Sequence, residues 1–287
     1  MSRCLTLCMI VRNEELRLQA CLDSARDLVN EILVVDTGST DATQQIALRN
    51  GATVLPFDFQ HVDFASARNY AIARATGEWI LALDADETLH SESLPLIETL
   101  VNRNDNAGYY VERHNHAAGK SEPAIDHAVR LFPNRPGYMY KGRVHETIDA
   151  SILAGGGCLH VSNIRIDHHF SPDPESRRRR NRWYIGILME ELAADPTDYS
   201  RLDFLAAEFH QLGLFREATC VAEGIARVRP LDPRAHLNAG VYHLMFCPDF
   251  DQARADFNRA LELKPGYPEA LSFLNTLEER MVRSPSH

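Results

Sequence analysis

A short apolar run ends on a cluster of carboxylates in the stretch Trp79-Ile80-Leu81-Ala82-Leu83-Asp84-Ala85-Asp86-Glu87. The apolar residues predict a buried strand, and the acidic residues fall where that strand stops. In open parallel sheets, ligands bind outside the carboxyl ends of the strands. Asp84 and Asp86 therefore predict a site for a hard divalent cation, Mg²⁺ or Mn²⁺, although an acidic surface turn has the same pattern.

The chain before this stretch alternates between strand and helix patterns. Further strands are expected at 5–11, 31–36 and 52–56, and helices from residue 12, at 42–49 and at 64–75. This alternation predicts an α/β fold with a mostly parallel sheet and helices on both faces. Asp36 ends the second strand, so it should lie at the same edge of the sheet as the acidic cluster.

Composition and charge exclude several classes of protein. The chain has 287 residues, with 30 Lys and Arg against 40 Asp and Glu, and its net charge of -10 disfavours binding to nucleic acid or to an anionic membrane surface. No apolar run is long enough for a membrane span or a signal peptide, so we expect a cytoplasmic protein. The six cysteines include no C-x-x-C pair and are interpreted as reduced core thiols. Glycine-rich phosphate-binding motifs are absent as well.

A second domain is expected after a linker near 171–175. Strand patterns stop there, and Pro196, Pro230 and Pro265 recur at intervals of 34 and 35 residues. The tetratricopeptide repeat has a period of 34 residues. We therefore expect domain boundaries of 1–172 and 173–287, with one leading half-repeat and two full repeats in the tail. The arginine run 177–180 is interpreted as a solvated helix face.

Four motifs in order resemble those of the family 2 glycosyltransferases, which have the GT-A fold. They are Leu7-Cys8-Met9-Ile10-Val11-Arg12-Asn13-Glu14-Glu15, Val34-Val35-Asp36-Thr37-Gly38-Ser39-Thr40-Asp41, Asp63-Phe64-Ala65-Ser66-Ala67-Arg68-Asn69 and the 77–87 segment. The resemblance implies a GT-A nucleotide-diphospho-sugar transferase domain followed by an all-α, tetratricopeptide-like tail. It also implies a transferase that moves a hexose from a nucleotide sugar, most often UDP-linked.

The resemblance assigns roles to individual residues of this chain. Nucleotide-sugar binding is implied for Ile10, Val11, Glu14, Asp36, Asp63, Arg68 and Asp84. Asp36 would accept a hydrogen bond from the base, and Asp63 and Arg68 would lie near the diphosphate. Asp84 and Asp86 would hold the metal ion, Mn²⁺ or Mg²⁺. A surface helix cation is the alternative interpretation of Arg68.

A later segment is similar to the acceptor side of a bacterial branch of this family, which includes lipopolysaccharide-core hexosyltransferases and peptide glycosyltransferases with tetratricopeptide repeats. It consists of Arg130-Leu131-Phe132 and Gly142-Arg143-Val144-His145-Glu146. An inverting transfer needs a base that removes a proton from the acceptor. Glu146 is the first candidate for this base and His145 is the second; a packed structural turn is the alternative.

The segment Ile164-Arg165-Ile166-Asp167-His168-His169 alternates between apolar and polar residues like a half-buried strand. By this alternation His168 shares a face with Ile164 and Ile166. Related enzymes have a histidine here that completes the metal or diphosphate site, so His168 is the third expected metal ligand. A structural histidine remains the alternative.

Two other functions fit parts of the sequence. Asp84-Ala85-Asp86-Glu87-Thr88 also matches the D-x-D-x-T signature of aspartyl-phosphate phosphatases, but two strand–helix units precede it and no later Asp-Asp pair follows. A tetratricopeptide scaffold with an inactive transferase domain is the non-enzymatic alternative. Within the transferase interpretation the acceptor is a saccharide or a peptide side chain, and the repeats would hold a protein partner or form a homodimer.

Overall fold

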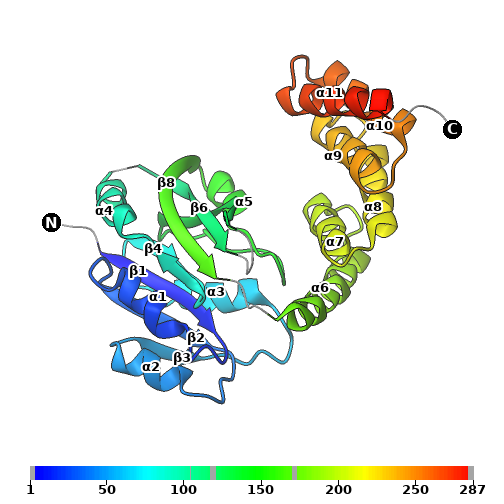
Figure 1. Cartoon of the computed structure of the whole chain (residues 1–287). Coiled ribbons are helices and arrows are strands. Elements are labelled where there is room, and N and C mark those ends of the chain that lie inside the picture. Colours follow the sequence, from blue (N-terminus) through cyan, green and yellow to red (C-terminus); the bar gives the residue numbers. More distant parts are fainter. Residues whose placement is uncertain (1–3, 104, 117–120, 170–172, 284–287) are drawn as a thin grey trace. The chain divides into compact units, whose positions relative to one another are not determined.

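The computed structural model describes residues 4–103, 105–116, 121–169 and 173–283. The chain divides into two compact units, Met1–Pro172 and Asp173–His287. The first unit combines strands and helices, whereas all elements of the second unit are helices. Figure 1 shows both units, and each is described separately below.

The first unit contains one sheet with helices on both faces (Figure 1). Its strands are β1 (Leu5–Val11), β2 (Glu31–Asp36), β3 (Thr53–Pro56), β4 (Trp79–Ala82), β5 (Glu87–Leu89), β6 (Ala107–His116), β7 (Ala124–Pro133) and β8 (Cys158–His169). Its helices are α1 (Leu18–Ala25), α2 (Thr43–Arg49), α3 (Phe64–Ile72), η1 (Ser91–Ser93), α4 (Leu94–Val101) and α5 (Asp149–Ala154).

The sheet is mostly parallel, as the sequence predicts. Its strand order is β3-β2-β1-β4-β7-β6-β8-β5. The first four strands are parallel, β7 is antiparallel to β4 and β6, and β8 is again parallel to β6. The short strand β5 pairs antiparallel with β8 and places Glu87 opposite His168. Strand β5 was not predicted, because three residues carry too little periodicity to identify a strand.

Two hydrophobic clusters cover the two faces of the sheet. Alternate residues of β1 divide between them: Leu7 and Met9 pack with α1 and α4, whereas Cys8 packs with α3 and α5. All four residues of β4 are buried. This burial on both faces explains why the central strands are continuous apolar runs instead of alternating ones.

Two helix boundaries differ from the sequence predictions by more than one residue. The helix expected from residue 12 begins only at Leu18, because Asn13 has a positive φ of 57° and Asn13–Arg17 form a loop and turns. The helix expected at 64–75 ends at Ile72. The cysteine prediction was wrong in part: all six cysteines are free, but Cys158 and Cys220 are exposed.

The second unit has the antiparallel helix pairs of a tetratricopeptide-type tail. Its helices are α6 (Pro174–Ala194), α7 (Tyr199–Gln211), α8 (Phe215–Val228), α9 (Pro233–Met245), α10 (Phe250–Leu263) and α11 (Pro268–Arg283). The pairs α7–α8 and α9–α10 are the two expected repeats, α6 is the leading half, and α11 is an additional helix. The expected linker lies partly outside the described residues, and it is shorter than predicted because Asp173 already caps α6.

Small residues let the helices of this unit approach closely. A Cβ atom at Gly240 of α9 would lie 2.6 Å from the ring of Phe257 on α10. Ala253, Phe257 and Ala260 are fully buried against α9 and α11. Within the described residues, no helix is both long enough and apolar enough to cross a membrane.

One buried histidine connects three helices of the second unit. His243 of α9 is 4% exposed, its Nδ1 lies 3.0 Å from Asp256 Oδ2 of α10, and its Nε2 lies 2.9 Å from Glu223 Oε1 of α8. The nearby His236 Nδ1 lies 3.9 Å from Asp256 Oδ1. The hydrogen bond to Asp256 raises the pKa of His243; burial opposes this, and the hydrogen bond to Glu223 adds to it.

This raised pKa makes the stability of the helical unit depend on pH. Because the pKa of His243 is higher in the folded state, protonation of this histidine stabilises the fold. The stabilisation is complete below about pH 6.5, the ordinary histidine pKa, and it is lost as the pH rises through the folded-state pKa. We expect His243→Gln to destabilise the chain at pH 6 and to differ less from the wild type at pH 9. Urea unfolding followed by circular dichroism measures this, with the exposed His61→Gln as control. An equal loss at both pH values would contradict the prediction.

Candidate active site

The loops after β1 and β2 are held together at the carboxyl edge of the sheet. The backbone N–H groups of Asn13 and Glu14 donate to Ser39 Oγ at 3.0 Å and to Thr43 Oγ1 at 2.7 Å. In return, Asn13 Oδ1 accepts from the N–H of Thr40 at 2.8 Å. The polar residues of the first two sequence motifs thus hold the backbone of the two loops together. Asn13, which makes two of these hydrogen bonds, has a positive φ.

Asp36 ends β2 with one carboxylate oxygen satisfied and the other without a partner. Its Oδ1 accepts from the N–H groups of Gly38 at 2.7 Å and Ser39 at 2.8 Å. Asp36 is 2% exposed, and its Oδ2 is buried with no hydrogen-bond partner among the described residues. A buried carboxylate oxygen without a donor is costly, so this position favours a ligand that carries an N–H group.

Asp84 lies between two buried arginines. Its Oδ1 accepts from Arg68 Nη2 of α3, and its Oδ2 accepts from Arg130 Nη2 of β7, both at 2.7 Å. Burial alone would raise the pKa of Asp84, but the charges of Arg130 and Arg68 outweigh it and hold this pKa well below its usual value. Asp84 is therefore ionised and connects α3, the end of β4, and β7.

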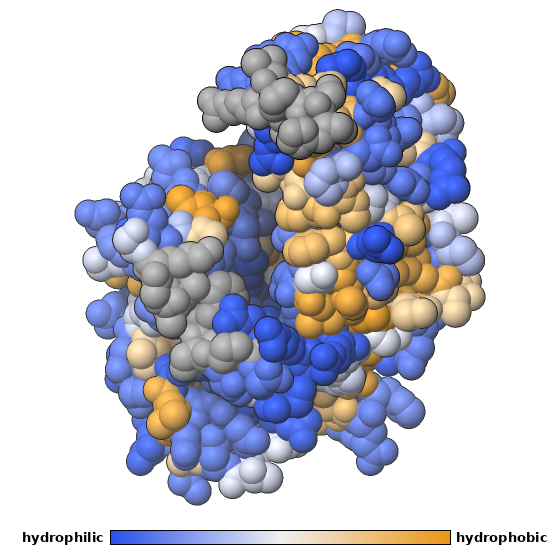
Figure 2. Space-filling view, turned by 45° about the vertical axis from the view of Figure 1, so that its right-hand side comes forward, coloured by the Kyte–Doolittle hydropathy of each residue, from blue (hydrophilic) through white to orange (hydrophobic). Residues whose placement is uncertain are grey.

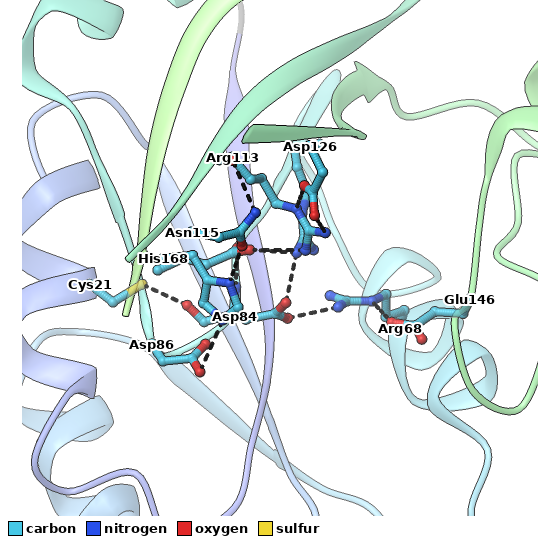
Figure 3. A network of polar contacts seen from close by, with 11 residues as sticks. Cys21, Arg68, Asp84, Asp86, Arg113, Asn115, Asp126, Glu146 and His168 are labelled. Atoms are coloured by element: carbon cyan, nitrogen blue, oxygen red, sulfur yellow. Dashed lines mark hydrogen bonds and ion pairs between the residues drawn. The ribbon is translucent and has the colours of Figure 1, made fainter. Parts of the chain in front are cut away.

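The ion network continues on both sides of Asp84 (Figure 3). Arg68 Nε donates to Glu146 Oε1 at 2.6 Å, and the Arg68 guanidinium lies 5.3 Å from the centre of the Tyr140 ring. On the other side, Arg130 Nη2 also donates to Glu87 Oε1 at 2.7 Å. Burial raises the pKa of Glu87, which is fully buried, and the charge of Arg130 offsets this only in part.

Arg130 and Glu87 are site residues that the sequence analysis named without giving them a role. A charged residue inside the buried strand β7 has to find a partner, and this requirement was the available signal. Arg130 is 5% exposed, and its Nε has no partner among the described residues. Arg113 Nη1 lies 3.6 Å from Glu87 Oε1 and carries the network on to Asp126.

Asp86 and His168 lie together, separate from Asp84. His168 Nε2 is 3.4 Å from Asp86 Oδ2, and its Nδ1 is 2.8 Å from Asn115 Oδ1 of β6. Because an amide oxygen only accepts hydrogen bonds, this contact puts the imidazole proton on Nδ1. Nε2 lies on the side of the ring that faces the Asp86 carboxylate. Figure 3 shows these three side chains converging.

The structure thus divides the three expected metal ligands. Asp86 and His168 are adjacent, whereas both carboxylate oxygens of Asp84 face arginines. In the described part of the chain, no three His, Cys, Asp or Glu side chains converge closely enough to hold a metal ion. Asp86 and His168 do fit a divalent cation by donor type, because a carboxylate and a neutral imidazole held by a neighbouring amide leave further positions for phosphate oxygens and water.

Glu14 belongs to the same region. Burial raises the pKa of Glu14, and the negative charge of Asp86 raises it further. The first and fourth sequence motifs therefore place carboxylates near each other, where a bound cation would relieve their repulsion. The thiol of Cys21 donates to the Asp84 carbonyl oxygen at 3.3 Å and holds the backbone between the two aspartates.

The turn that carries His145 and Glu146 is anchored on α3. The side chain of Asn69 makes two hydrogen bonds with the backbone of Tyr140, at 2.8 and 3.0 Å. His145 has a positive φ of 49°, which is unfavourable for a residue with a side chain and marks a constrained turn. The third motif and the acceptor-side segment therefore form one substructure, and Glu146 reaches Arg68 from it.

The remaining expected residues lie at the same edge in less direct positions. Val11 is buried, and its carbonyl oxygen accepts from both the N–H and the hydroxyl of Thr37 at 3.1 Å; Ile10 is half-buried. Asp63 caps the N-terminus of α3: its Oδ1 accepts from the N–H of Ser66 at 2.8 Å. The pattern Asp63-Phe64-Ala65-Ser66 is a capping signal from which this contact could have been predicted.

Comparison with known proteins identifies the fold and the family of this chain. The crystal structure of S. aureus TarS 1-349 in complex with UDP-GlcNAc shares the fold, with 14% sequence identity, a TM-score of 0.50, and coverage of 98% of this chain and 92% of that one. The α/β unit has the GT-A fold. The model of glycosyl transferase family 2 matches residues 6–160, more than half of the chain, and the chain belongs to this family.

Two curated relatives are similar to this chain. The SPbeta prophage-derived glycosyltransferase SunS of Bacillus subtilis is 27% identical over 226 residues, which cover 75% of this chain and 51% of that protein. A TPR repeat-containing protein of Synechococcus elongatus is 43% identical over 149 residues, which cover 52% of this chain and 36% of that protein. The matched regions thus span about a third to a half of the length of these relatives.

Two substitutions of Asp63 can distinguish its structural role as a helix cap from a role near a diphosphate. We expect Asp63→Ala to destabilise the fold by about 1 kcal/mol, as the loss of a helix cap does. Asp63→Asn retains an acceptor oxygen and should keep both the stability and the affinity for UDP. Urea unfolding and calorimetric titration with UDP measure the two quantities. Weaker UDP binding by the Asn variant at unchanged stability would contradict a purely structural role.

Proposed function

We propose that this chain transfers a hexose from a nucleotide sugar, with UDP as the nucleotide, to a saccharide or a peptide side chain, with inversion at the sugar carbon. The observation that carries the proposal is the pairing of Asp86 with His168 beside two buried arginines, at the carboxyl edge of a GT-A sheet. Family membership supports the reaction class, and this edge combines cationic and metal-binding groups suited to a diphosphate.

The nucleotide would occupy the ends of β1 and β2. Asp36 Oδ2 supplies the acceptor that the ring N–H of uracil requires, and the partnerless state of this oxygen supports the assignment. Ile10 and Val11 provide the backbone and apolar surface beside the base. Glu14, whose pKa is raised by burial and by the charge of Asp86, is assigned to the ribose and diphosphate side.

Asp86 and His168 would hold Mn²⁺ or Mg²⁺, which supplies positive charge for the departing diphosphate when it is bound. Asp84 has a different role in this proposal: its carboxylate forms ion pairs with Arg68 and Arg130 and holds both guanidinium groups in place. Arg68 is oriented by two carboxylates and offers planar donors to phosphate oxygens. Asn115 orients His168 through Nδ1.

Glu146 would be the base of the reaction. In an inverting transfer the acceptor oxygen or sulfur attacks the sugar carbon, the bond from that carbon to the diphosphate oxygen breaks, and the acceptor proton passes to the base. Glu146 is 13% exposed and bonded to Arg68, so it is positioned beside the proposed diphosphate site. His145, the neighbouring residue in the constrained turn, is the second candidate.

The phosphatase alternative requires Asp84 as a free nucleophile. Both of its carboxylate oxygens accept hydrogen bonds from buried arginines, and the family match lies with glycosyltransferases. We therefore do not propose phosphatase activity. The helical repeats are proposed to hold a protein partner, a peptide acceptor or a second copy of the chain.

A nucleotide-sugar panel with Mn²⁺ tests the donor and metal proposal. We expect one UDP-sugar, with UDP-GlcNAc among those tried, to raise the melting temperature and to be hydrolysed slowly, and we expect EDTA to remove both effects. Asp86→Ala should lose the metal-dependent response, because one of the two proposed ligands is gone. The exposed Asp58→Ala removes the same charge and should behave like the wild type. Full metal-dependent activity of Asp86→Ala would refute the metal site.

Replacement of Glu146 by Gln tests the base. The amide oxygen can still accept from Arg68 Nε, so the fold and the donor affinity should be kept. Without a base, kcat should fall by about 10²- to 10⁴-fold. Steady-state kinetics with an identified acceptor measures kcat, and calorimetry measures the donor affinity. An unchanged kcat would transfer the role to His145 or to another group.

A further inference from the structure

Glu87 is a buried carboxylate next to the proposed cation ligand Asp86. Charged side chains usually lie at the surface, where Figure 2 shows hydrophilic residues in blue, but Glu87 is 0% exposed. A buried carboxylate is costly unless hydrogen-bond donors surround it. Both oxygens of Glu87 have donors, which come from different segments of the chain: the backbone of Asp84 and the side chain of Arg130 on β7.

The first of these contacts closes the turn that carries Asp86. The N–H of Glu87 donates to the Asp84 carbonyl oxygen at 3.0 Å, as in a β-turn over residues 84–87. In return, Glu87 Oε2 accepts from the N–H of Asp84 at 2.9 Å. The two ends of the turn therefore hold each other both through the backbone and through a side chain, and Asp86 is the third residue of this turn.

The second contact and the strand pairing fix this turn relative to the rest of the site. Glu87 Oε1 accepts from Arg130 Nη2 at 2.7 Å. On the backbone, Glu87 of β5 pairs with His168 of β8, and the Asp86 carbonyl oxygen accepts from the N–H of His169 at 3.0 Å. Glu87 thus connects three segments, namely the turn that presents Asp86, the strand that carries His168, and β7.

Arg130 has a carboxylate partner without Glu87. Asp84 Oδ2 accepts from the same nitrogen, Arg130 Nη2, at 2.7 Å. The neighbouring Arg113 likewise has its own partner, because it donates to both oxygens of Asp126 at 2.7 and 2.8 Å. Within the part of the chain that the structure describes, the side chain that reaches the N–H of Asp84 is that of Glu87. The contact with the turn is therefore what distinguishes Glu87 from the other carboxylates of the network.

We propose that Glu87 is a positioning residue for the cation site, because it holds the 84–87 turn so that the Asp86 carboxylate faces His168. This role rests on the proposed function, in which Asp86 and His168 are the cation ligands. Replacing a group that orients a metal ligand typically weakens metal binding by about 10- to 100-fold. Asn115 orients His168 on one side of the site, and Glu87 orients Asp86 on the other.

The affinity for Mn²⁺ in the presence of UDP tests this role without turnover. It is measured from the electron paramagnetic resonance signal of free Mn²⁺, and the melting temperature of each variant is measured in parallel without metal. Glu87→Gln retains one acceptor oxygen but places an NH₂ group opposite one of the two donors. We expect this variant to bind Mn²⁺ about ten-fold more weakly, or weaker still.

A second variant, Glu87→Asp, separates the position of the carboxylate from its charge. It keeps a negative charge beside Arg130, so we expect it to fold even if Glu87→Gln does not. Its carboxylate is one methylene further from the two donors, and the contact with the N–H of Asp84 should be lost or lengthened. We therefore expect its affinity for Mn²⁺ to fall about ten-fold as well.

Two controls separate positioning from a general loss of stability. Glu98→Gln removes the same charge from an exposed site on α4. Tyr109→Phe removes a hydrogen bond of a buried residue near the start of β6, from the Tyr109 hydroxyl to Asp105 at 2.8 Å, and should lower the melting temperature. Both controls should bind Mn²⁺ like the wild type.

The outcomes distinguish this role from the proposed function. Weaker Mn²⁺ binding in the Glu87 variants, with both controls unchanged, supports the role of Glu87. Wild-type affinity in a folded Glu87→Gln or Glu87→Asp variant would overturn this role and leave the cation site in place. Equal weakening in Tyr109→Phe would also overturn it, because the loss would then follow stability. No Mn²⁺ binding by the wild type would overturn the cation site and the role of Glu87 with it.

Discussion

The ion pairs of Asp84 with Arg68 and Arg130 determine how the carboxyl edge of the sheet is built. Two guanidinium groups that are almost completely buried require carboxylates within hydrogen-bond distance. Asp84, Glu87 and Glu146 satisfy this requirement from two separate parts of the chain, the segment after β4 and the turn at 142–146. Through these contacts α3, β4, β7 and the turn at 142–146 hold one another, so the geometry of the candidate site depends on the charge balance of its own residues.

Much of the fold was predictable because the central strands are buried on both faces. Their apolar runs, and the turn residues that follow them, identified the parallel part of the sheet and its functional edge. The antiparallel arrangement of β6 and β7 and the short strand β5 were not predictable, since they depend on pairing between distant segments. For the tail, the recurrence of Pro196, Pro230 and Pro265 was sufficient to predict the repeats, but α11 has no such signal.

The site was predictable as a set of residues and less so as a set of contacts. Asp84 and Asp86 are the same residue type, two positions apart, and only the location of Arg68 and Arg130 shows that the first of them faces arginines. Alternation along the strand predicted that His168 shares a face with Ile164 and Ile166, yet its neighbour Asn115 could come only from the pairing of β6 with β8. Asp63 was assigned to the diphosphate by resemblance, although its position three residues before Ser66 at the start of a helix pattern already indicated the cap that it forms.

The pairing of β5 with β8 has a consequence for the order in which the domain assembles. The contact between Thr88 and Asp167 joins residues 79 positions apart, and the same pairing brings His168 to Asp86. Bringing such distant segments together costs loop-closure entropy before any contact compensates for it. A chain emerging from the ribosome would carry its first three motifs long before this strand, so Asp86 and His168, which we propose as cation ligands, can meet only after β8 has been made and has paired.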